Sequence, residues 1–185
     1  MDSTKTLIKE FAKSIIGSLI FVILLTQFII KPIQVNQSSM YPTLKDQQLG
    51  FSNIWSYKLF GLNRFDVVIF YSTQMEDYLV KRVIALPGET IEVKNGQLYI
   101  NQVHTDEPFL NQDYVSEMTK QFGYFTQDFG PITLKSNEVF LMGDNRPYST
   151  DSRAFGPFTV DTIICKDVIV FYPFNEVHAV LGVNP

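Results

Sequence analysis

The chain has 185 residues, of which 45% are hydrophobic and 14% aromatic, enough to form the core of one domain of ordinary size. Its formal net charge of -4 supplies no basic surface for phosphates, which argues against a general nucleic-acid-binding protein. The single cysteine, Cys165, excludes an intrachain disulfide and a CxxC site, and His104 and His178 do not have the spacing of metal ligands, so no metal or cofactor is expected.

Residues 14–30 contain no charged side chain. As a helix this run spans roughly 25 Å, a little less than the hydrocarbon layer of a bilayer. It is longer than the apolar region of a typical signal peptide, lacks a small-x-small cleavage site and is apolar on every face, so an uncleaved anchor is favoured over a signal peptide or a buried core helix.

The charges beside this run predict how the chain is oriented. Three lysines precede it: Lys5, Lys9 and Lys13. Positive charge favours the cytoplasmic side, so we expect a single-pass cell-membrane protein whose domain after the anchor lies on the extracellular side. The predicted parts are a cytoplasmic segment at 1–13, a transmembrane anchor at 14–30 and an external domain at 31–185.

The external domain is predicted to be mainly β. Runs of β-branched and aromatic residues indicate strands at 66–71, 77–86, 138–142 and 162–172. Residues 90–101 read as a hairpin, in which Asn95-Gly96 forms a two-residue type I′ turn. No run with a helical period is evident after residue 34. Residues 102–133 are polar, aromatic and weakly periodic, and we interpret them as an inserted lobe or a long loop.

The stretch from Gln37 to Leu44 has two interpretations. Serines before a proline are typical of a turn, but a serine just beyond a membrane anchor is also a candidate nucleophile, which requires a base. Both histidines lie in polar segments, and the G-x-S-x-G and S-x-x-K motifs are absent. The remaining candidate base is a lysine that has lost its charge.

Lys81 is the lysine that best fits this requirement. In a strand it shares a face with Leu79, Val83 and Ala85, so it either protects a sheet edge or is desolvated, with a lowered pKa. The neighbouring Arg82 would lower this pKa further if it lies close. Periodicity alone does not place Lys81 near Ser39.

Four ordered segments resemble the motif boxes of type I signal peptidases. They are residues 39–44 (SMYPTL), 64–68 (RFDVV), 80–89 (VKRVIALPGE) and 142–153 (MGDNRPYSTDSR). The resemblance extends from the anchor to about residue 158 and is closest to the single-span form of Gram-positive bacteria. It implies a signal-peptidase-type fold and a serine endopeptidase that works without metal or cofactor.

The resemblance also implies the roles of individual residues. Ser39 is the nucleophile and Lys81 the general base, and Ser149 hydrogen-bonds and orients the lysine. Four charged residues brace the site: Arg82, Asp144, Asp151 and Arg153. One oxyanion donor is the backbone N–H of Ser39. The second comes from two positions earlier, where the family has Gly or Ser and this chain has Gln37, which leaves open whether its backbone or its side chain donates.

The implied partners are the signal peptides of exported preproteins, bound as an extended strand, and the lipid bilayer. Near the bilayer, Met40, Phe51, Trp55 and Phe60 either contact lipid or pack in the core. Two other functions remain open. One is a catalytically weak relative that assists assembly of surface proteins, which Gln37 alone favours. The other is a self-cleaving Ser/Lys peptidase of the repressor type, which the anchor and the lack of a DNA-binding segment disfavour.

Overall fold

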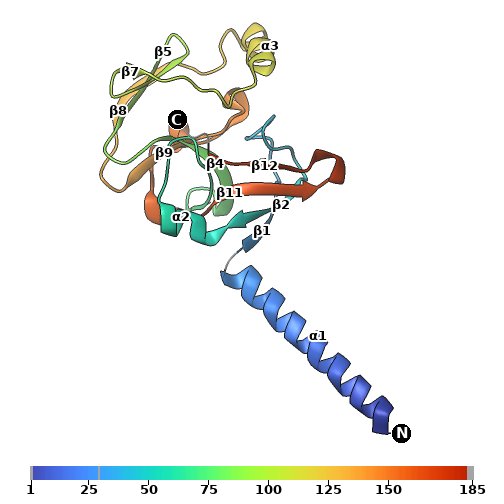
Figure 1. The fold of residues 1–185 in the computed structure, drawn as a ribbon. Helices are drawn as coiled ribbons and strands as arrows, with labels where there is room; N and C mark the ends of the chain where they lie inside the picture. Colours follow the sequence, from blue (N-terminus) through green and yellow to red (C-terminus); the bar gives the residue numbers. More distant parts are fainter. Residues whose placement is uncertain (1, 29, 183–185) are drawn as a thin grey trace.

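The structure is a computed structural model that describes residues 2–28 and 30–182 (Figure 1). A long helix, α1 (Asp2–Phe28), projects away from a β-rich body. Three shorter helices belong to that body: α2 (Ile54–Phe60), α3 (Gln112–Phe122) and α4 (Ser152–Phe155). The β-rich body confirms the predicted fold class of the external part.

The helix α1 differs in its bounds from the predicted anchor at 14–30. It begins at Asp2, and Ile30 already belongs to β1 (Ile30–Gln34), which pairs with β2 (Leu49–Asn53). Ladder hydrogen bonds to β2 fix the extended backbone there, so the helix cannot continue to residue 30. The side chains of residues 25–29, within the predicted anchor, lie outside the described residues. Among the helices in the described part of the chain, none is long and apolar enough to cross a membrane.

The larger sheet is antiparallel, in the order β1-β2-β11-β3-β4-β9-β10, and β12 pairs with β11. Its remaining strands are β3 (Val67–Ser72), β4 (Asp77–Ala85), β9 (Glu138–Met142), β10 (Phe158–Thr159), β11 (Ile163–Tyr172) and β12 (His178–Val180). Four of them confirm the strands predicted at 66–71, 77–86, 138–142 and 162–172, because buried apolar side chains specify them. The strand β4 therefore lies in the interior of the sheet, between β3 and β9.

The smaller sheet has the order β7-β6-β5-β8 and forms the upper lobe of Figure 1. Its strands are β5 (Thr90–Lys94), β6 (Gln97–Ile100), β7 (Val103–His104) and β8 (Phe129–Thr133). The hairpin β5–β6 turns at Asn95-Gly96, whose φ angles of 50° and 73° are those of the predicted type I′ turn.

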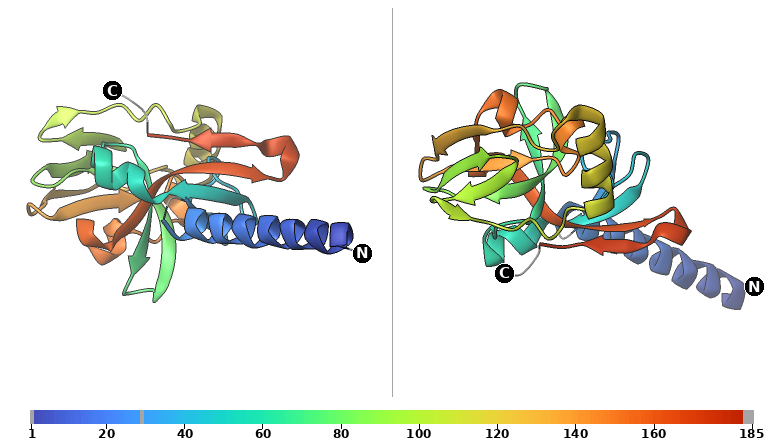
Figure 2. Two further views of the ribbon diagram at one scale, coloured as in Figure 1. Left: turned by 60° about the horizontal axis from the view of Figure 1, so that its bottom comes forward. Right: turned by 90° about the horizontal axis from the view of Figure 1, so that it is seen from above.

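The segment 102–133 is an ordered part of this lobe rather than a long loop. It contributes β7, β8 and the helix α3, which Figure 2 shows beside the smaller sheet. Asn111 caps the start of α3 by accepting a hydrogen bond from the Tyr114 backbone N–H at 2.9 Å, and Gly123 ends it with a φ of 81°. These caps enclose Val115, Met118 and Phe122, which recur at helical spacing, so the sequence contained a helical pattern that the prediction overlooked.

Apolar clusters join the two sheets and fix the loops around them. One cluster packs side chains of β5 and β6 against β4 and β9, including Ile84, Ile91 and Phe140. A second cluster lies beside β2, β3 and β11 and includes Met40 and Leu44 from the loop after β1. The loop that carries Ser39 is therefore anchored in the core of the larger sheet.

Candidate active site

Ser39 lies in a tight turn that is fixed by two buried apolar side chains after it. Met40 and Leu44 are 1% and 0% exposed, and the Leu44 backbone N–H donates to the Met40 carbonyl at 2.9 Å. Because Met40 packs in the core, the proposed contact of Met40 with lipid is wrong. Its burial instead fixes the backbone next to Ser39, whose side chain is largely buried.

Lys81 approaches Ser39 from the centre of the larger sheet. Its Nζ lies 2.6 Å from Ser39 Oγ, across 42 positions of sequence, and the residue is 1% exposed. Leu79, Val83 and Ala85, which alternate with it along β4, are buried as well. Because β4 is an interior strand, the interpretation of Lys81 as an edge protector is excluded.

Burial lowers the pKa of Lys81 from 10.5 to about 8. The carboxylates of Asp151 and Asp144 oppose this effect, while the guanidinium of Arg153 adds to it. From the sequence, Arg82 was expected to lower the pKa of Lys81. In the structure the cation that lowers this pKa is Arg153. Adjacent strand residues point to opposite faces of a sheet, which directs Arg82 away from the amine.

On the opposite face of β4, Arg82 forms a buried ion pair with Asp144. Its Nε and NH2 groups donate to the two carboxylate oxygens at 2.8 and 2.6 Å, and NH1 donates to the Phe65 carbonyl. The guanidinium lies 4.1 Å from the ring centre of Phe109, and Thr43 donates to Asp144 at 2.6 Å. The pair links β4 to the loop after β9. Through Thr43 it also reaches the loop between β1 and β2, residues 35–48, which carries the candidate nucleophile Ser39 and is here called the nucleophile loop.

Asp151 and Arg153 form a second brace beside the amine. Arg153 donates to Asp151 through Nε and NH2 at 2.9 and 2.8 Å, and the Gly143 backbone N–H donates to Asp151 at 3.0 Å. Burial raises the pKa of Asp151, but the hydrogen-bonded guanidinium of Arg153 outweighs it and the pKa lies below its ordinary value. The carboxylate is therefore charged at neutral pH.

Ser149 does not make the hydrogen bond to Lys81 that the resemblance implied. Its buried Oγ makes no hydrogen bond of ordinary geometry among the described residues, but it lies close enough to Asp151 to help lower the pKa of that carboxyl. The hydroxyl packs against the Cα of Gly143, where a Cβ would collide with Ser149 Oγ and the Ser39 carbonyl. Packing against Gly143 and proximity to Asp151, rather than a bond to Lys81, therefore hold Ser149 in this structure.

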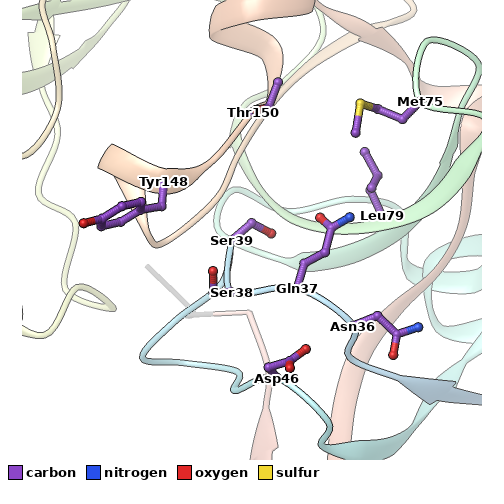
Figure 3. Close-up of a pocket in the computed structure, with 9 residues that line it drawn as sticks. All are labelled: Asn36, Gln37, Ser38, Ser39, Asp46, Met75, Leu79, Tyr148 and Thr150. Carbon is purple, nitrogen blue, oxygen red and sulfur yellow. The ribbon is translucent and has the colours of Figure 1, made fainter.

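Two cavities meet at Ser39, with volumes of about 440 and 260 Å³. Ser39, Gln37 and Leu79 line both of them, and Figure 3 shows the Gln37 side chain between Ser39 and Leu79. Gln37 is exposed. Together the cavities provide an open path on both sides of the nucleophile. Within the described residues, no group of three or more His, Cys, Asp or Glu side chains could hold a metal ion.

The sequence assigned no role to Asn145 or Tyr114, yet both lie beside the nucleophile loop. Asn145 donates to the carbonyls of Ser38 and Ser39. Asn145 lies within the fourth motif segment, residues 142–153, and membership of that segment is the sequence feature that could have identified it. Tyr114 belongs to α3 and donates to Asn145, and nothing in its sequence neighbourhood indicates this contact.

The catalytic geometry can be compared with known proteins. The family described as signal peptidase, peptidase S26, matches residues 8–172. The chain belongs to this family. Signal peptidase I S of Bacillus subtilis is 41% identical over 94% of both chains, and signal peptidase IB of Staphylococcus aureus is 39% identical over 91% of this chain and 92% of that one. The expected serine endopeptidase of the signal peptidase I type is thereby confirmed.

One solved structure in the same family is similar. The crystal structure of a signal peptidase I from Enterococcus faecalis is 33% identical, covers 57% of this chain and 95% of its own, and has a TM-score of 0.49. The Bacillus and Staphylococcus relatives are signal peptidases by name, so the family favours the peptidase over an assembly factor.

Proposed function

We propose that this protein removes signal peptides from exported preproteins, with Ser39 as nucleophile and Lys81 as general base. The observation that carries the proposal is the 2.6 Å contact between Ser39 Oγ and a buried lysine amine. Desolvation makes the neutral amine available near pH 8, which is the form that a general base requires. An exposed lysine would remain protonated and could not serve.

The reaction has two steps. Lys81 takes the proton of Ser39 while Oγ attacks the scissile carbonyl, and the resulting ammonium then protonates the leaving amine. This leaves an ester on Ser39. A water then enters, gives a proton to the same amine and attacks the ester. The Ser39 oxygen leaves and takes that proton back from the ammonium, which releases the peptide acid and restores Ser39 and the neutral amine.

Charge develops on the carbonyl oxygen in both steps and requires hydrogen-bond donors. We assign one donor to the backbone N–H of Ser39 and the second to Gln37, whose side chain lies beside Ser39 in Figure 3. The brace Arg82–Asp144 holds the loop after β9 against β4, and the brace Asp151–Arg153 fixes that loop internally through Gly143. Charge-assisted, bidentate pairs are directional, so they keep the amine and the hydroxyl in register.

We further propose that α1 anchors the protein in the cell membrane with its amino end in the cytoplasm. Its described side chains from Leu7 to Leu24 include many exposed apolar ones, and residues 14–30 carry no charge. Figure 1 shows α2 on the side of the body from which α1 leaves. Trp55 and Phe60 of α2 are 44% and 75% exposed, so α2 would lie at the lipid surface.

Cleavage of a precursor by the detergent-solubilised full chain tests the peptidase. We expect the wild type to cleave it, and Ser39→Ala and Lys81→Arg to be inactive, because arginine stays protonated at working pH. Lys135→Arg, at an exposed site, is the matched control and should keep full activity. Full activity of Lys81→Arg would remove Lys81 from the mechanism.

A separate experiment tests the membrane contact. We expect Trp55→Ser to slow cleavage of a vesicle-embedded precursor but not of a soluble peptide, whereas Phe174→Ser, at another exposed aromatic, should change neither. Protease added outside intact protoplasts, from which the cell wall has been removed, should degrade the catalytic domain. Protection of that domain would overturn the proposed orientation.

A further inference from the structure

The nucleophile loop is held by a side chain that does not take part in the chemistry. The Asn145 backbone N–H donates to the Ser39 carbonyl at 3.0 Å, and its Nδ2 donates to the Ser38 carbonyl at 2.9 Å. Asn145 is 3% exposed. It therefore binds two consecutive carbonyls of the turn that carries the nucleophile, in a place where water cannot easily replace it.

The orientation of the Asn145 amide is set by a tyrosine from the inserted lobe. Tyr114 donates its hydroxyl proton to Asn145 Oδ1 at 2.9 Å. This bond leaves the Nδ2 group facing the Ser38 carbonyl, because oxygen accepts and nitrogen donates. Tyr114 also packs edge-to-face against Tyr41, with ring centres 5.1 Å apart, so it contacts the same loop a second time.

The lobe offers Tyr114 from a fixed position. Tyr114 lies in the first turn of α3, capped by Asn111, and its ring contacts Phe125 at 6.3 Å between centres. Next to Asn145, the buried Arg146 donates to Thr126 at 3.1 Å and forms an ion pair with Glu107. These contacts tie α3 and its flanking segments to the loop after β9.

We propose that Tyr114 is a positioning residue, which holds Ser39 against Lys81 by orienting Asn145. The inserted lobe at 102–133 is then part of the catalytic apparatus, although it contributes no group to the reaction. The inference rests on the proposed function for its kinetic readout. Its structural content, a tether from α3 to the nucleophile loop, can be measured without a substrate.

Removing only the Tyr114 hydroxyl is the sharpest perturbation. We expect Tyr114→Phe to lower kcat by about three- to tenfold, the equivalent of one ordinary hydrogen bond, because Ser39 would meet Lys81 in fewer conformations. The KM for a peptide substrate should not change, since Tyr114 lines neither cavity at Ser39. Tyr124→Phe removes a hydroxyl from the same lobe, away from these contacts, and should leave both constants unchanged.

A double-mutant cycle tests whether Tyr114 acts through Asn145. If it does, Tyr114→Phe should have no further effect on kcat in an Asn145→Ala background. Equal losses in both backgrounds would show that Tyr114 acts by another route and would overturn the proposal. A fall in kcat that comes with a raised KM would also count against it, because it would place Tyr114 in substrate binding.

Hydrogen exchange of the detergent-solubilised full chain separates this inference from the proposed function. We expect amides of residues 38–44 to exchange several times faster in Tyr114→Phe than in the wild type or Tyr124→Phe. If the wild type cleaves no precursor but this difference is seen, the peptidase assignment fails and the tether stands. If exchange in that loop is the same in all three proteins, the tether is refuted even where cleavage occurs.

Discussion

Burial of Lys81 should destabilise the folded protein at neutral pH, and removing the amine should relieve that cost. The pKa of Lys81 falls from 10.5 to about 8 because burial disfavours the charged form. A difference of this size corresponds to about 3 kcal/mol in the free energy of unfolding. Below pH 8 the amine is charged in both states, and the full cost is present.

The sign of the pH dependence follows from proton binding. Between pH 8 and 10.5 the folded protein has released this proton while the unfolded chain still binds it, so wild-type stability rises with pH in that window. Lys81→Met carries no such proton. We therefore expect the stability advantage of Lys81→Met to be largest at pH 6–7 and to fall by about 3 kcal/mol by pH 10.5.

Chemical denaturation of detergent-solubilised wild type and Lys81→Met at several pH values measures this difference. Leu79→Met lies on the same buried face of β4 and is the control for repacking, with an effect that should not depend on pH. Loss of the contact with Ser39 changes the free energy of unfolding of Lys81→Met by the same amount at every pH, so it does not alter the pH dependence. A stability difference that is the same at pH 6 and pH 10.5 would refute a desolvated amine.

Three other perturbations address the same site. The kcat/KM of the wild type should rise with pH through a midpoint near 8, where Lys81 becomes neutral, and a flat profile from pH 6 to 9 in peptide cleavage would contradict this base. Arg153→Gln removes the cation that lowers the Lys81 pKa, so the midpoint of the kcat/KM profile should move to higher pH. A midpoint at lower pH would contradict the effect assigned to Arg153 on the pKa of Lys81. Arg82→Met leaves Asp144 buried without its partner and should cost about 3–5 kcal/mol in denaturation, whereas Arg82→Met combined with Asp144→Leu should recover most of it.

The parts of the site that could be predicted are those read from one strand or one motif. The alternation around Lys81 left open a sheet edge or a desolvated amine, and its burial in β4 decides for the desolvated amine. The effect assigned to Arg82 failed because neighbours in sequence lie on opposite faces of a strand, while Arg153, far along the chain, lies on the side of the amine.

The inserted lobe marks where prediction from the sequence ended. Strong apolar alternation and Asn95-Gly96 were enough to predict the β5–β6 hairpin. In α3, by contrast, Val115, Met118 and Phe122 recur at helical spacing between polar residues, and the prediction of a lobe or long loop overlooked this pattern and the caps. The contact of Tyr114 with Asn145 joins residues 31 positions apart and leaves no periodic trace.

The sequence by itself determined the β-rich character of the domain, the candidate nucleophile and base, and the order of the motifs that contain them. Only the tertiary structure decided that Ser39 and Lys81 meet, that Asp144 pairs with Arg82 and that Ser149 packs against Gly143 rather than bonding to Lys81. The physical reason is that local patterns record which face of an element is buried. Which distant segment covers that face depends on how the two sheets and the lobe pack together.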